Sequence, residues 1–469
     1  MAAVIGPLSL VVATLTLGGV VAARHMIGYA DAQIAVQNQG YVPFSDAPIR
    51  YRDPVRDPVA LAQKALDEGR ATLAYDKDRG YLPAVLKLLG IPVSSQTLVF
   101  SKTSFQFTRI SADHPRALYY NDDVYVGSVH QGKTVELISF DPMQGAIFYL
   151  LDDVDTARPR FQRAELDCTQ CHIAAGTRGV PGVLLRSVYP APTGTLTPRA
   201  PQYITDQKSP LGERWGGWYV TGALASATMA NAATLPAAAA ITPADRRLPA
   251  LGPIGTRFDA AAYLTSTSDQ VALLVLGHQT QMHNLITLTN YQTRIALHTL
   301  AAGGKVAATP PALESLPPAT QEMIRRPAEQ LIRYLLFSGE TPLGGLDRRR
   351  TIAASAFAHT FAAQGPRDRK GRSLRDFDLH DRIFRYPCSY LIYSAAFDAI
   401  PEPAKGYVYR RLLEILTGGD RNADFANLSA ADREAILSIL IDTKPDLPPA
   451  WRRHAAATGP SNVRTILKT

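Results

Sequence analysis

The sequence has little charge for its length and no concentrated basic region. Charged residues make up 19% of the 469 residues, against 46% hydrophobic residues, and 49 lysines and arginines stand against 41 acidic residues. This balance is typical of a globular chain and not of a disordered one. The basic residues are scattered instead of forming a stripe interleaved with aromatic side chains, so no nucleic acid is expected as a partner.

The chain opens with an uncharged stretch that lacks the basic residues usually found at the start of a signal peptide. Residues 1–23 contain no charged side chain, end in small residues and precede Arg24 and His25. An apolar stretch of this length can cross the hydrocarbon layer of a membrane, which is about 30 Å thick. We assign residues 1–26 to a signal or transmembrane segment. The expected protein is exported, and is either periplasmic or anchored in the inner membrane facing the periplasm if the segment is not cleaved.

Alternating hydrophobicity predicts a sheet in the first half of the chain. Between residues 96 and 153, aromatic and β-branched residues recur at every second position in segments separated by turn sequences. The clearest hairpin turn is DPMQG at residues 141–145. Two helices, one within residues 57–75 and one ending at Gly90, are expected before this antiparallel meander.

Helical periodicity replaces this pattern in the second half of the chain. It begins near residue 268, continues for some thirty residues and returns near 320–338, 378–399, 404–417 and 430–442. The predicted fold class is therefore α+β. An antiparallel, β-rich N-terminal part that bears the functional site, residues 27–256, precedes a mainly helical C-terminal part, residues 257–469, which we expect to pack on it.

Cysteine is rare, and two of the three cysteines lie in one pentapeptide, Cys168-Thr169-Gln170-Cys171-His172. A structural zinc site needs four nitrogen or sulfur ligands, usually from two closely spaced pairs, and the only other cysteine is the distant Cys388. A thioredoxin-like redox pair lies between a strand and a helix of a βαβ unit, whereas this pair follows a meander and precedes a glycine-rich stretch. A third interpretation explains the pentapeptide better than a zinc site or a redox pair does.

Covalent haem attachment accounts for the whole pentapeptide. Cys-x-x-Cys-His is the signature of c-type haem attachment, in which two thiols bond to the vinyl groups of the macrocycle and the imidazole ligates the iron. Cys168 and Cys171 are the predicted anchors, and His172 is the predicted proximal ligand. Bacteria attach this haem outside the cytoplasm, which agrees with the N-terminal segment. The sequence holds one such motif, so we expect one covalent haem c and exclude the usual layout of a di-haem peroxidase.

The ligand on the opposite face of the iron decides between electron transfer and reactions with small molecules. Met229 is the first choice, because it follows His172 by 57 residues, a separation comparable with that in small soluble cytochromes c. His278 or His283 is the alternative. These two histidines lie five residues apart in a predicted helix, so they point about 140° away from each other and at most one can face the iron.

Aromatic and basic residues after the motif are candidates for a haem pocket. Trp215, Trp218 and Tyr219 stand beside flexible glycines, and we predict that they form part of an apolar slot for the porphyrin. Positive charges that could neutralise the haem propionates come from three arginines: Arg178, which is the first choice, Arg186 and Arg214.

Several stretches resemble a family of exported bacterial proteins that carry a single c-type haem motif. They include RALYYNDDVYVGSV, LISFDPMQGAIFYLLD, CTQCHIAAGTRGVPGVLLRSVYP and SPLGERWGGWYVTG, and the resemblance spans residues 70 to 450 or so. In that family a methionine followed by a small residue and an asparagine stands after the tryptophan-rich motif, which matches Met229 and Asn231. A helix with two histidines matches His278 and His283. The resemblance implies haem binding and brings no established reaction.

Two functions follow from this interpretation. The first is an exported c-type cytochrome that transfers electrons to or from redox partner proteins. The second is a haem-dependent, peroxidase-like oxidoreductase in which the distal position is open or exchangeable and His278 or His283 acts as general acid and base. The size of the chain, which exceeds what a carrier needs, is the reason for the second hypothesis.

Overall fold

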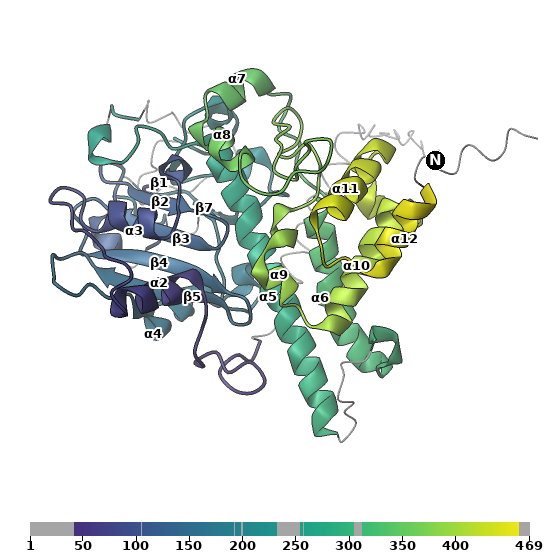
Figure 1. Cartoon of the computed structure of the whole chain (residues 1–469). Helices are drawn as coiled ribbons and strands as arrows, with labels where there is room; N and C mark the ends of the chain where they lie inside the picture. Colours follow the sequence, from purple (N-terminus) through teal and green to yellow (C-terminus); the bar gives the residue numbers. More distant parts are fainter. Residues whose placement is uncertain are drawn as a thin grey trace, which may run out of the picture.

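The computed structural model describes residues 42–104, 106–191, 193–197, 200–231, 254–256, 258–303 and 312–458. The predicted N-terminal segment, residues 1–26, lies outside these ranges. Within them no helix combines the length and apolarity needed to span a bilayer. The chain forms an antiparallel sheet with helices against both faces, and most helices come from its second half (Figure 1). The predicted α+β class is confirmed.

Seven strands form the main sheet, in the order β6-β5-β4-β3-β2-β1-β9, and all neighbours are antiparallel. The strands are β1 (Thr97–Val99), β2 (Arg116–Tyr120), β3 (Val124–Val129), β4 (Thr134–Asp141), β5 (Gly145–Asp152), β6 (Gln162–Arg163) and β9 (Trp218–Tyr219). Strands β2 to β5 are the predicted meander. A separate hairpin consists of β7 (Arg186–Val188) and β8 (Gln202–Ile204).

The turn between β4 and β5 is the hairpin that the sequence predicted most clearly. The Asp141 carboxylate accepts hydrogen bonds from the backbone amides of Met143 and Gln144, at 2.8 and 2.9 Å. Gly145 follows with a φ of +71°, a left-handed conformation that glycine adopts without strain. The hairpin prediction is therefore confirmed, down to the roles of the aspartate and the glycine.

The two faces of the sheet belong to two different buried clusters. Leu98, Tyr119 and Leu137 pack on the side of α2 (Pro58–Asp67) and α3 (Leu82–Leu88), which Figure 1 shows in front of the strands. Alternate residues of a strand point to opposite faces. The strand residues that alternate with Leu98, Tyr119 and Leu137 therefore point to the other face, where Tyr125 and Phe140 pack with α5 (Gln270–Ala302). Helices α2 and α3 are the two that the sequence predicted before the sheet.

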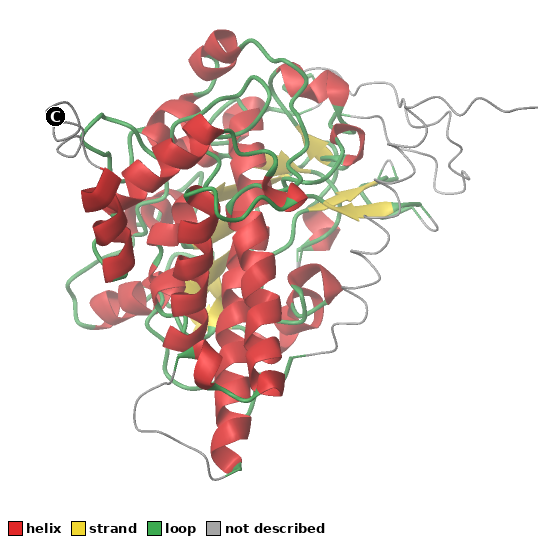
Figure 2. Ribbon diagram, turned by 90° about the vertical axis from the view of Figure 1, so that its right-hand side faces the viewer, coloured by secondary structure: helices red, strands yellow, loops and turns green. Residues whose placement is uncertain are grey.

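The long helix α5 packs on the sheet with one side and on helices of the second half of the chain with another. Figure 2 shows it running through the molecule, with the strands behind it and further helices beside it. These are α6 (Pro318–Leu335), α7 (Arg348–Ala353), α8 (Ala356–Ala362), α9 (Ala395–Asp398), α10 (Glu402–Leu416), α11 (Ala430–Thr443) and α12 (Pro449–Thr458). One buried cluster contains residues of the sheet, of α5 and of α6 to α12. The two halves of the chain therefore share a core.

The helix predicted near residues 378–399 is wrong over most of its length. The Asp378 carboxylate accepts hydrogen bonds from the backbone amides of the next residues, which makes a turn, and Pro387 has no amide hydrogen to donate. Only a 3-10 turn, Tyr390–Tyr393, and the short α9 are helical there. The apolar side chains that produced the periodic pattern are buried all the same, in irregular backbone.

Candidate functional site

The pentapeptide lies at the end of a short helix, α4 (Glu165–His172), that the sequence did not predict. The chain leaves the sheet directly before α4, where the amide of Ala164 donates to the carbonyl of Phe148 at 3.0 Å. Cys168 and Cys171 are one turn apart and therefore share a face of the helix. Neither sulfur is in a disulfide bond; Cys168 is half-buried and Cys171 is exposed. Both sulfurs are therefore in the thiol form that covalent attachment needs.

The imidazole of His172 is held in one tautomer. Its Nδ1 lies 2.9 Å from the carbonyl oxygen of Gly182, which can only accept, so Nδ1–H is the donor. The amide of Gly182 in turn donates to the His172 carbonyl at 3.0 Å. Burial lowers the pKa of His172, with the Gly182 carbonyl opposing the shift. The neutral ring therefore carries its lone pair on Nε2, as a metal-ligating histidine does when its other nitrogen donates to a backbone carbonyl.

Helix α5 positions the loop that orients His172. The side-chain amide of Asn284 accepts from the amide of Val183 at 3.0 Å and donates to its carbonyl at 2.8 Å. A side chain at Gly182 would collide with the Asn284 amide, so the glycine allows this close approach. Gln281, one turn earlier on α5, donates to the carbonyl of Gly176 at 2.9 Å. The loop after the pentapeptide is thus attached to the core of the molecule at two points.

The ring of His172 lies over the α5-facing side of the sheet. Its centroid is 5.0 Å from that of Phe148 in β5. Phe148 pairs across the strands with Ile138, and Ile138 pairs with Tyr125. Ile138 and Leu118 are only half-buried although they occupy central strands. Beside His172 the sheet therefore offers an apolar surface that a flat macrocycle can cover.

The two predicted tryptophans both lie on this side of the sheet. Trp218, in β9, pairs with Val99 of β1 and donates its indole N–H to the carbonyl of Arg186 at 2.8 Å. Trp215 has a φ of +64° and is fully buried, and its indole nitrogen has no hydrogen-bond partner among the described residues. Tyr219, the third residue predicted for the slot, follows Trp218 in β9. It therefore points to the opposite face, away from His172, and does not share a surface with the two tryptophans.

Two of the three predicted propionate arginines, Arg214 and Arg186, have hydrogen-bond partners in the structure, whereas the Nε of Arg178 is buried without one among the described residues. Arg214 is buried and donates to the backbone carbonyls of Ser209 and Gln207, at 2.8 and 3.0 Å. Arg186 donates to the side chain of Gln202 within the β7–β8 hairpin. Arg178 is largely desolvated, which lowers its pKa, and the charge that most opposes this shift is Asp206. Its assignment to the haem pocket stays a prediction.

Met229, the predicted distal ligand, is buried close to the segment that contains Trp215 and Trp218. Its sulfur accepts a weak hydrogen bond from the Ser187 hydroxyl at 3.8 Å, and its amide donates to the Arg214 carbonyl at 2.9 Å. The amide of Asn231 donates to the Trp218 carbonyl at 2.9 Å, which ties the two predicted motifs together. The contacts described for Met229 and for His172 have no residue in common, so the distal role of Met229 stays a prediction.

The alternative distal ligands, His278 and His283, face opposite sides of α5, as their spacing predicted. His278 points toward the helices, with Nδ1 at 2.5 Å from the Gln207 side chain and Nε2 at 2.7 Å from the Ser389 hydroxyl. His283 points toward the sheet, stacks on Phe140 at 3.9 Å and donates from Nε2 to a backbone carbonyl. Burial lowers the pKa of His278 to about 3 and that of His283 to about 4. Both are neutral core histidines in this arrangement.

Two charged residues close to His172 were missed by the sequence interpretation. Arg116 of β2 and Glu136 of β4 form an ion pair of 2.6 Å on the α5-facing side of the sheet. Both side chains are mostly buried, at 15% and 14% exposure. The available signal was a charged residue in the middle of an alternating strand pattern. Recognising it requires the strand register, which the sequence alone does not give.

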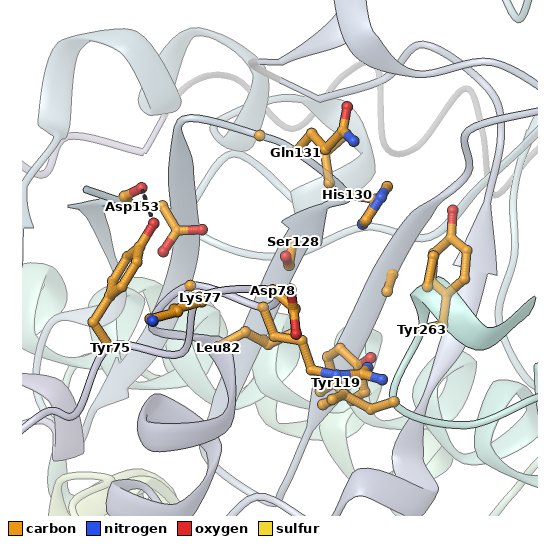
Figure 3. Close-up of a pocket in the computed structure, with 17 residues that line it drawn as sticks. Tyr75, Lys77, Asp78, Leu82, Tyr119, Ser128, His130, Gln131, Asp153 and Tyr263 are labelled. Carbon is orange, nitrogen blue, oxygen red and sulfur yellow. Dashed lines mark hydrogen bonds between the residues drawn. The ribbon is translucent and has the colours of Figure 1, made fainter. Parts of the chain in front are cut away.

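A surface cavity of about 170 Å³ lies on the other side of the sheet (Figure 3). Among its lining residues are Tyr119, whose side chain faces α3, and Asp153, which accepts from the amide of Tyr81 at 2.7 Å. Because the sheet separates this cavity from His172, it is not part of the candidate site. Among the described residues, no group of three or more His, Cys, Asp or Glu side chains could hold a metal ion.

The comparisons with known proteins bring no family. No protein-family model matches the chain, and no similar curated protein or solved structure was found. The function must therefore be inferred from the residues of this chain. The donor set consists of Cys168 and Cys171, which are one turn apart and form no disulfide, and of the adjacent imidazole with its lone pair on Nε2. This set fits a c-type haem.

Proposed function

We propose that the protein is an exported c-type cytochrome that binds one haem c covalently and transfers electrons. The observation that carries the proposal is the pairing of the Cys-x-x-Cys-His motif with the hydrogen bond from His172 Nδ1 to the Gly182 carbonyl. A redox cysteine pair needs no oriented imidazole. A structural zinc site needs four ligands, and among the described residues no group of three or more His, Cys, Asp or Glu side chains could hold a metal ion. A histidine that ligates a metal almost always donates its other ring N–H to a partner such as the Gly182 carbonyl, as His172 does.

Each part of the site has a role in this function. Cys168 and Cys171 hold the macrocycle through two thioether bonds, and His172 ligates the iron. The bound haem supplies a one-electron couple whose potential depends on the ligands and on the surrounding polarity. Phe148 supports the His172 ring, and the half-buried Ile138 beside it provides apolar surface that excludes water from the macrocycle. Trp215 and Trp218 are buried on the same side of the sheet, and their contact with the macrocycle stays a prediction.

Partner and location are part of the same proposal. Cys171 is exposed, so the attachment site is at the surface, where a redox partner protein can approach. The N-terminal segment, residues 1–26, would place the protein in the periplasm or on the inner membrane facing it. Met229 is the proposed distal ligand. His278 has both ring nitrogens occupied by buried partners, and His283 is stacked on Phe140 with its Nε2 donated to the Asp122 carbonyl, which leaves only its buried Nδ1 without a partner among the described residues.

The proposal is tested by expressing the chain with a c-type maturation system and staining a denaturing gel for haem. We expect a haem-positive band for the wild type and for Cys388→Ala, and no band for the double variant Cys168→Ala, Cys171→Ala. Cys388 is the matched control, because it is buried and far from the motif. A haem-negative wild type, or a haem-positive double variant, would overturn the proposal.

The distal ligand is tested by the absorption spectrum of the oxidised protein. Methionine ligation gives a weak long-wavelength sulfur-to-iron charge-transfer band, which we expect in the wild type and not in Met229→Leu. A high-spin spectrum that changes on addition of carbon monoxide or peroxide would instead favour the oxidoreductase. In that case Met229→Leu leaves the spectrum unchanged.

A further inference from the structure

Arg116 lies flat across the centre of the sheet because residue 127 is glycine. Gly127 of β3 is opposite Leu118 of β2 and opposite Glu136 of β4. A Cβ atom at position 127 would collide with the guanidinium of Arg116. Without a side chain there, Arg116 of β2 reaches over β3 to the carboxylate of Glu136 on the far side, at 2.6 Å.

In this ion pair the carboxylate of Glu136 has several hydrogen-bond donors, whereas one donor of Arg116 has no acceptor. Glu136 accepts from Arg116 and also from the Ser104 hydroxyl at 2.7 Å and the Gln106 amide at 3.2 Å. The Nε atom of Arg116 is buried and has no partner among the described residues. A buried guanidinium N–H without an acceptor costs stability. Arg116 therefore retains a charged donor for a further anionic partner on this side of the sheet.

The strand register places the pair beside the candidate haem site. Glu136 and Ile138 are two residues apart in β4 and point to the same face, and Ile138 pairs with Phe148, on which His172 lies. Arg116 reaches Glu136 across Gly127, so both charges lie on the face of the sheet that His172 covers.

We propose that Arg116 binds a propionate of the haem and that the Arg116–Glu136 pair sets the reduction potential. This inference rests on the proposed function. A haem c carries two carboxylates that need compensation in a partly buried site. Arg116 has an unused donor on the face of the sheet that His172 covers, whereas Arg214 is committed to backbone carbonyls. Arg178 also has a buried Nε without a partner among the described residues, but the charge that most affects it is Asp206. A cation beside the iron favours the ferrous form, and an anion favours the ferric form.

The test is the midpoint potential of three variants purified with their haem. Arg116→Gln is expected to lower the potential and Glu136→Gln to raise it, each changing the ferric-to-ferrous ratio roughly tenfold at a fixed potential, which is about 59 mV for one electron. Gly127→Ala keeps all charges and displaces the guanidinium, so a smaller decrease is expected. Lys64→Gln is the control, because it removes an exposed charge on α2, on the opposite face.

Opposite signs for Arg116→Gln and Glu136→Gln separate an electrostatic role from a structural one, since a loss of packing would not reverse sign between them. A haem-loaded Arg116→Gln whose potential matches that of the wild type overturns this inference and leaves the cytochrome proposal standing. A wild type without covalent haem overturns both. Equal shifts in Arg116→Gln and Lys64→Gln also contradict the inference, because they would show a general charge effect.

Discussion

The side chain of Asn284 forms hydrogen bonds with both the amide and the carbonyl of Val183, at 3.0 and 2.8 Å. These bonds fix the loop whose Gly182 carbonyl orients His172. Helix α5 thus reaches the candidate iron ligand through one asparagine and one glycine. We predict that Asn284→Ala leaves two buried backbone groups unpaired and lowers the free energy of unfolding by about 2–4 kcal/mol. Denaturant titration measures this loss. A change below about 0.5 kcal/mol, the usual range for a surface substitution, would contradict the assignment.

His278 is predicted to stabilise the core instead of acting at the haem. His278→Ala removes the partners of Gln207 and Ser389 and opens a cavity between stacked rings, so a loss of about 2–4 kcal/mol is expected. The exposed His359 on α8 is the control, and His359→Ala should leave stability nearly unchanged. Haem attachment and the visible spectrum should be those of the wild type in both variants. A spectral change in His278→Ala alone would make it a distal ligand.

Glu340 is predicted to make stability depend on pH. Burial raises its pKa from 4.5 to about 7, so between these values the folded protein binds a proton that the unfolded chain has released. The contribution of Glu340 to the free energy of unfolding is therefore fully present below pH 4.5. It decreases as the pH rises and is lowest above pH 7. Glu340→Gln removes this dependence and keeps an acceptor for the Ile383 amide. The stability of the wild type relative to Glu340→Gln should fall across that window; a flat difference would refute the prediction.

The three thiols are predicted to differ in reactivity before haem is attached. Burial raises the pKa of Cys388 far above that of an exposed thiol, whereas Cys171 is exposed at the end of α4. Brief treatment of the unmatured protein with iodoacetamide should therefore label Cys171 and leave Cys388 unmodified. Peptide mass spectrometry gives the readout, and labelling in denaturant shows that all three thiols can react. Equal labelling of Cys171 and Cys388 under native conditions would contradict the fold around them.

Much of the fold follows from local patterns, and the candidate site follows only in part. The meander, the Asp141 turn and α5 were predictable, because alternation, turn residues and helical spacing are local signals. The apolar spacing near residues 378–399 led to a wrong helix prediction, because a buried segment with irregular backbone can have the same apolar spacing as a helix. The opposite orientations of His278 and His283 followed from helix geometry alone.

The surroundings of His172 depend on contacts between distant parts of the chain. Asn284 and Phe148 approach it from α5 and β5, and nothing in their local sequence indicates this. Arg116 can be recognised as a candidate only from the strand register, which places its side chain over Gly127. The arginines chosen from the sequence were close to the motif along the chain, whereas the one that the register places beside His172 comes from a strand some fifty residues earlier.

The most direct test of the account is the mass of one tryptic peptide from the matured protein. Cleavage after Arg163 and Arg178 releases residues 164–178, which contain both motif cysteines and His172. We predict that this peptide carries the added mass of one haem, and that the peptide containing Cys388 has its unmodified mass. Recovery of residues 164–178 with two free thiols, from protein made alongside a working maturation system, would contradict the central claim.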